Sequence, residues 1–159
     1  MPETNNNTPQ RRRRQQPVDS TLAHVQPQAT EIERAVLGAL MIDKDAYAVV
    51  CEMLTPESFY EPRNQKVYAA IQELSLHENP VDVWTVTEKL ANMGELENVG
   101  GPGYVTDISS RVASSANVEY HARIVAQKSL ARQLIQFSSN IQTKAFDETI
   151  DVDDLMQEA

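Results

Sequence analysis

The sequence predicts an all-α fold: a compact head of about six short helices, followed by a helical hairpin built on one long helix. Apolar residues recur at three- and four-residue spacing in most segments, and no segment shows the alternation typical of strands. Prolines and glycines divide the first 113 residues into short periodic segments. Residues 115–145 then contain neither Gly nor Pro, which allows a helix of about 45 Å.

Charge is distributed unevenly along the 159 residues. The net charge is −9, but residues 1–30 carry +2 because Arg11–Arg14 outweigh two acids, so the remaining 129 residues carry −11. Such an acidic body argues against a nucleic-acid clamp, which neutralises phosphates with Lys and Arg. The single Cys51 excludes an internal disulfide. Because no apolar run approaches about 20 residues and no signal peptide is visible, we expect a soluble cytoplasmic protein without a membrane partner.

Residues 1–27 are predicted to be a disordered tail, since they hold four prolines, an Asn run and almost no apolar residues. The run Arg11–Arg14 leaves two interpretations open. It is either part of a solvated tail or a contact site for nucleic acid or an acidic partner.

The head is expected over residues 28–113 and begins with a helix near Thr30. Thr30 and Glu33 have the spacing of a capping box, in which each side chain accepts a backbone N–H of the first turn. Gly38 lies inside this helix at a cost of about 1 kcal/mol relative to Ala. A close helix crossing would explain why a glycine is present.

Local signals predict the next helix starts. We expect Asp43 to cap a second helix and Cys51 to lie on its apolar face, as a small core residue rather than a nucleophile. Pro56 and Pro62 each suit the first position of a helix, so they predict two further starts.

The last part of the head has equally local signals. Asp82 is expected to cap a helix and Gly94 to end it in the left-handed conformation. Trp84 lies off the apolar stripe of this helix, which favours either packing at a helix junction or a partner-binding patch. The sequence Gly-Gly-Pro at residues 100–102 then predicts the start of a short final helix.

The hairpin is expected over residues 114–159. Its long helix has a broad apolar side that a small head would not cover, so we predict that it mediates self-association. Asp151 can cap a return helix, and this second arm is expected to be cut short. Spacing alone does not separate contacts within one chain from contacts between chains. The candidate interface residues are Val118, Ala122, Val125, Leu130, Leu134, Phe137 and Ile141.

The sequence contains no pattern that predicts catalysis. It has no G-x-x-x-x-G-K-[ST] loop, no G-x-G-x-x-G turn, and no Cys or His spacing that suits zinc. We therefore expect no catalytic, cofactor-binding or metal-binding residue in these 159 positions, and no enzyme in this chain by itself.

Five segments form an ordered set of motifs. They are Ala29–Asp43 (ATEIERAVLGALMID), Leu54–Ile71 (LTPESFYEPRNQKVYAAI), Pro80–Leu90 (PVDVWTVTEKL), Gly94–Ile108 (GELENVGGPGYVTDI) and Ser114–Val125 (SSANVEYHARIV). In this order and spacing they resemble the N-terminal domain of the bacterial replicative DNA helicases of the DnaB family. The tail before residue 28 lies outside that pattern.

The resemblance implies a helical head whose hairpins pair between subunits, and a trimer of dimers that forms one collar of a hexameric ring. It further implies docking of primase through the primase's C-terminal region, and a response to a helicase loader. ATP and Mg²⁺ would be bound by a RecA-like ATPase domain outside these 159 residues. That domain would also contact DNA and drive 5′→3′ unwinding at a nucleoid-associated replication fork.

Two other hypotheses stay open. The first is a stand-alone helical adaptor without helicase activity. The second is a DNA-binding module that acts through Arg11–Arg14, whose binding would weaken steeply with salt.

Overall fold

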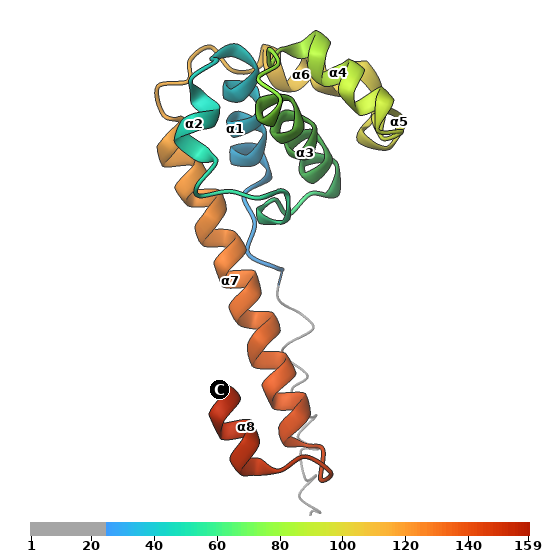
Figure 1. Ribbon diagram of the computed structural model, residues 1–159. Helices are drawn as coiled ribbons and strands as arrows, with labels where there is room; N and C mark the ends of the chain where they lie inside the picture. Colours follow the sequence, from blue (N-terminus) through green and yellow to red (C-terminus); the bar gives the residue numbers. More distant parts are fainter. Residues whose placement is uncertain (1–24) are drawn as a thin grey trace, which may run out of the picture.

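The computed structural model describes residues 25–159, and in this range it has eight α-helices, one short 3-10 helix and no strand. The head contains α1 to α6, and α7 runs out of it as a long arm with α8 folded back beside its far end (Figure 1). The predicted all-α head with a hairpin is therefore confirmed. The predicted tail with Arg11–Arg14 lies almost entirely outside the described residues.

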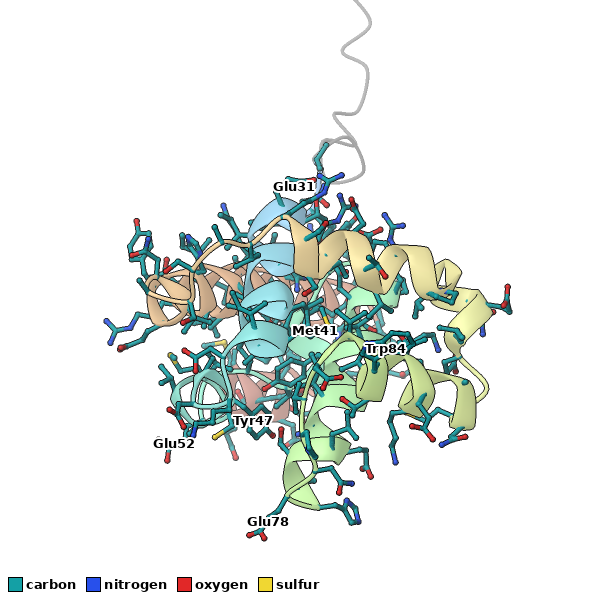
Figure 2. The ribbon with its side chains drawn as sticks, turned by 90° about the horizontal axis from the view of Figure 1, so that it is seen from above. Glu31, Met41, Tyr47, Glu52, Glu78 and Trp84 are labelled. Carbon is teal, nitrogen blue, oxygen red and sulfur yellow. The ribbon has the colours of Figure 1, made fainter. Side chains whose placement is uncertain are left out.

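Helix α1 (Thr30–Ile42) forms the centre of the head and packs against α3, α6 and α7. Figure 2 looks down on the head and shows α1 in the middle, with Met41 near the centre. Gly38 lies where α1 crosses the end of α6, and a Cβ atom there would be 2.7 Å from the carbonyl oxygen of Ile108. The predicted close crossing at Gly38 is confirmed.

The predicted capping box of Thr30 and Glu33 is wrong. Ala29 occupies the N-cap position of α1, and no side chain caps this end. Glu33 is buried, and its carboxylate accepts hydrogen bonds from the backbone N–H of Tyr60 and the side-chain amide of Asn64. A carboxylate can be buried here because its oxygens are hydrogen-bonded to other parts of the head.

Both helix starts predicted from prolines are confirmed. Pro56 begins η1 (Pro56–Ser58), and Pro62 begins α3 (Pro62–Leu76). Each proline needs no hydrogen-bond partner at this position, because the first N–H groups of a helix lack an intrahelical acceptor.

The predictions for α2 (Ala46–Val50) are wrong in two details. Asp45, rather than Asp43, occupies the N-cap position, and the carboxylate of Asp43 instead accepts the backbone N–H of Asp45 at 2.9 Å. Cys51 is exposed rather than part of the core. Cys51 directly follows the helix in a helical conformation, and its backbone N–H donates to the carbonyl oxygen of Tyr47, but its side chain lies on the exposed side.

The signals around α4 (Val83–Asn92) are confirmed. The carboxylate of Asp82 accepts the backbone N–H of Thr85 at 2.9 Å, and the Thr85 hydroxyl accepts the N–H of Asp82 in return. Gly94 follows the helix with a φ of 73°. Trp84 is 84% exposed, so the interpretation that it packs at a helix junction is wrong.

The short α5 (Leu96–Val99) is not predicted by the sequence analysis, because four residues are too few to show a helical period. Helix α6 (Gly101–Ser110) follows directly and confirms the start predicted at residues 100–102. Gly100 joins the two helices with a φ of 108°, a conformation that glycine adopts without a steric penalty.

The hairpin consists of α7 (Val118–Ala145) and α8 (Val152–Glu158). Asp151 caps α8 as predicted, since its carboxylate accepts a backbone N–H of the first turn at 2.8 Å. Figure 1 shows α8 running back toward the head beside the far end of α7. Leu155 is buried against α7, and this contact makes α8 part of the arm.

Candidate assembly interface on the helical arm

The first half of α7 belongs to the core of the head. Val118, Ala122 and Val125 are buried together with residues of α1, and Ser129 is buried one turn further along. In this fold these three apolar candidates therefore cover the chain's own core.

The second half of α7 leaves the head and exposes its apolar side chains. We call Leu130, Leu134, Phe137 and Ile141 the arm stripe. The exposed fractions are 65% for Leu130, 63% for Leu134 and 41% for Phe137, whereas Ile141 is half-buried. Single exposed apolar residues are common on proteins, but a row of them along one projecting helix is typical of an interface.

The end of the arm adds further exposed apolar surface. Phe146 follows α7, and Val152 and Met156 lie on α8; all three are exposed. An ion pair between the Lys144 ammonium and the Glu158 carboxylate, at 2.5 Å, ties the end of α7 to the end of α8. The arm thus presents a two-helix surface rather than a single bare helix.

A hollow of about 540 Å³ lies along α7 on the side of the N-terminal segment. Leu134 and Ile135 supply its apolar wall, and Gln26 of the N-terminal segment also lines it. A second hollow, of about 400 Å³, lies between the end of α3 and α4, and its wall is mainly polar. The apolar hollow on the arm is therefore the better place for apolar side chains of another chain.

One side chain fixes the point where α7 leaves the head. The guanidinium group of Arg132 donates to the carbonyl oxygen of Pro27 at 2.7 Å and to that of Ser58 at 2.9 Å. It also lies over the ring of Tyr60, with 5.5 Å between the guanidinium carbon and the ring centre. The sequence analysis missed Arg132, because both acceptors are backbone carbonyl groups far away in the sequence. Such contacts do not depend on the side chains at those positions, so no sequence pattern indicates them.

Buried Glu33 is the second residue that the sequence analysis did not recognise. Besides the bonds from Tyr60 and Asn64, its carboxylate accepts the backbone N–H of Glu61 at 3.4 Å. The side-chain oxygen of Asn64 in turn accepts a hydrogen bond from the Tyr104 hydroxyl. This network connects α1, the segment after η1, α3 and α6 through one carboxylate.

The start of α7 is connected to the end of α1 by a side-chain contact. The Ser115 hydroxyl donates to the carboxylate of Asp43 at 2.5 Å. This bond, together with the backbone N–H of Asp45, lowers the pKa of Asp43 below its ordinary value, because both donors stabilise the ionised form.

Between residues 25 and 159, no three His, Cys, Asp or Glu side chains come together as a metal site would require. No helix found in that range is long and apolar enough to cross a membrane. The features that stand out are the arm and its junction with the head.

The structure thus shows a small helical head with a projecting helical hairpin that exposes apolar side chains. The family model described as "DnaB-like helicase N terminal domain" matches residues 25–127. The chain belongs to this family, and the resemblance stated from the sequence is confirmed.

Relatives and solved structures agree with this assignment. The chain is 46% identical over 134 residues to the replicative DNA helicase DnaB of Rhodothermus marinus and 43% identical over 133 residues to the replicative DNA helicase DnaC of Bacillus subtilis. Each alignment covers 84% of this chain, but only 14% and 29% of those proteins. The chain therefore spans less than a third of the length of these relatives.

The crystal structure of the N-terminal domain of DnaB helicase from Mycobacterium tuberculosis is similar at a TM-score of 0.80 and 36% identity, with 84% of this chain and 94% of that chain covered. A DnaB-like replicative helicase, whose structure was described with its interactions with primase, is similar at a TM-score of 0.64 and 27% identity. That alignment covers 73% of this chain and 27% of the other.

Proposed function

We propose that this chain is the collar domain of a hexameric replicative DNA helicase, and that it holds subunits together through the arm. The observation that carries the proposal is the exposed arm stripe on a helix that projects from a well-packed head. Within the arm stripe, Leu130, Leu134 and Phe137 are the exposed members, so we assign the contact between chains to this half of α7. Val118, Ala122 and Val125 would support it indirectly by anchoring the helix in the head.

The arm stripe is tested by the double substitution Leu134→Ser and Phe137→Ser. Burial of the exposed half of each side chain contributes about 1 kcal/mol, so the loss over two paired chains is roughly 4 kcal/mol, or about a thousandfold in the dissociation constant. Analytical ultracentrifugation of the native and the substituted chain measures this loss.

Leu76→Ser is the matched control, because Leu76 is a similarly exposed leucine on the head, at 67%. This variant should associate like the native chain. If the double variant associates as tightly as the native chain, the arm stripe is not the interface.

The same collar is proposed to dock primase. Support comes from the related DnaB-like helicase whose structure was described with its interactions with primase. A purified C-terminal region of primase, titrated into the fluorescently labelled chain, should bind saturably. Absence of binding to the assembled chain would remove primase from the proposal. A helicase loader is a further proposed partner, to be tested in the same way.

The whole protein is proposed to bind ATP and Mg²⁺ in a separate ATPase domain and to unwind DNA in the bacterial cytoplasm. Support comes from the relatives, which are named replicative DNA helicases. The gene sequence beyond Ala159 tests this directly, since a linker followed by G-x-x-x-x-G-K-[ST] is expected. A stop codon at that point would favour the stand-alone adaptor instead.

A further inference from the structure

We infer that Arg132 is a positioning residue, which sets the direction in which the arm leaves the head. Its two hydrogen bonds reach Pro27 in the N-terminal segment and Ser58 in η1, which lie 105 and 74 positions earlier in the chain. Its guanidinium group also lies over the ring of Tyr60. One side chain of α7 thereby contacts the N-terminal segment and η1 of the head at the same time.

Arg132 lies where α7 leaves the head, between buried Ser129 and the exposed residues that begin at 133; we call this point the neck. Ser129 is buried one turn before it, whereas every residue from 133 to 140 is exposed. The 13 residues from 133 to 145 extend about 20 Å beyond the neck, so a rotation of 10° there moves the tip by roughly 3–4 Å. Packed interfaces do not tolerate mismatches of this size, because interdigitated side chains leave few voids.

The chemistry of arginine suits this role. A guanidinium group is planar and presents several N–H donors in fixed directions, so it can bind two carbonyl oxygens at once and fix its own orientation. Hydrogen bonds from a charged donor are stronger than neutral ones. A pair of such bonds from one rigid group restrains rotation of α7 beyond the last of its buried apolar contacts, which lie in its first turns.

The η1 segment that Arg132 binds is itself fixed to the rest of the head. The Ser58 hydroxyl accepts the backbone N–H of Thr55 at 3.0 Å, and the N–H of Tyr60 donates to buried Glu33. Glu33 is bonded in turn to Asn64 of α3 at 2.8 Å. Arg132 therefore binds a part of the head that is hydrogen-bonded to α1 and α3. These bonds fix the orientation of the arm relative to the head.

The consequence for assembly rests on the proposed function. Two arms that pair along their arm stripes must approach each other at a defined angle. Arg132 fixes the angle between head and arm in the single chain, before two chains associate. Without it, the arm would leave the head over a wider range of angles, and restricting this range on binding weakens association by roughly tenfold if it costs as much as one charged hydrogen bond.

The experiment measures the head-to-arm distance within one chain by double electron–electron resonance. The single natural cysteine, Cys51, is exposed on the head and takes one spin label, and Asn140→Cys on the arm takes the other. Labelled chain is diluted into unlabelled native chain, so that only distances within one chain contribute. Arg132→Ala should broaden the distance distribution. Arg123→Ala is the matched control, because Arg123 pairs with Glu119 on the same helix, and it should leave the distribution narrow.

An unchanged distribution in Arg132→Ala, at an unchanged melting temperature, would overturn the inference. If Arg132→Ala fails to fold, Arg132→Gln takes its place with the same expectation, because its shorter, uncharged side chain keeps the aliphatic stem but only one donor group. Sedimentation of the same samples separates the two proposals. A broadened distribution in a chain whose native form does not associate refutes the proposed function and supports the inference, whereas an unchanged distribution in an associating chain does the reverse.

Discussion

Gly38→Ala tests the close approach of two helices in the head, where α1 crosses the end of α6. The new Cβ atom would lie 2.5 Å from Cγ2 of Val112 and 2.7 Å from the carbonyl oxygen of Ile108. The valine methyl can shift, but the carbonyl oxygen belongs to the backbone of α6, so the two helices must separate. Overpacking of this kind costs about 1–3 kcal/mol.

The higher helix propensity of alanine opposes this cost by about 1 kcal/mol. A cost in the middle of this range, about 2 kcal/mol, therefore leaves a net loss of roughly 1 kcal/mol in the free energy of unfolding, and a melting temperature lower by roughly 2–4 °C. Urea unfolding followed by circular dichroism measures the loss, with the slope of the transition unchanged.

Gly103→Ala is the control for Gly38→Ala, since a Cβ atom at Gly103 in α6 would meet nothing within 4 Å. This variant should be neutral, or more stable by up to about 1 kcal/mol. If Gly38→Ala proves as stable as Gly103→Ala, the close crossing of α1 and α6 is refuted.

Two further predictions concern carboxylates of the head. Glu33→Ala leaves buried donors without an acceptor and should lower the free energy of unfolding by roughly 3–5 kcal/mol. Glu31→Ala, on the exposed side of α1, is the control and should change this free energy little. Equal effects of the two substitutions in urea unfolding would contradict the buried network. Asp43 has a lowered pKa because of the hydrogen bond from Ser115, so its stabilising effect is present above the ordinary pKa of about 4 and is lost as the pH falls through the folded-state value. The melting temperature of the native chain should therefore decrease more steeply below about pH 4 than that of Asp43→Asn; parallel curves would exclude this contribution.

Local signals predict helix starts in this chain because the physics that determines them is local. Pro56, Pro62, Asp82 and Asp151 act within three or four residues of their own position, and all four helix starts are confirmed. The same reasoning fails at Cys51, which continues the helical conformation of α2 but lies on its exposed side.

Long-range contacts explain the other differences. Glu33 fits a capping pattern by spacing, but its burial depends on Tyr60 and Asn64, which lie about thirty positions later. Arg132 reads as an ordinary surface cation, because its acceptors are backbone carbonyls that any residue could supply. Periodicity alone likewise shows the apolar side of α7 without showing that its first half lies in the core and its second half outside.

The mass of the native chain in solution tests the role of the arm most directly. Sedimentation equilibrium over a concentration series should show a mass that rises from the monomer value of 17.8 kDa to at least twice that value. A mass that stays at 17.8 kDa up to high micromolar concentration would contradict assembly through the arm.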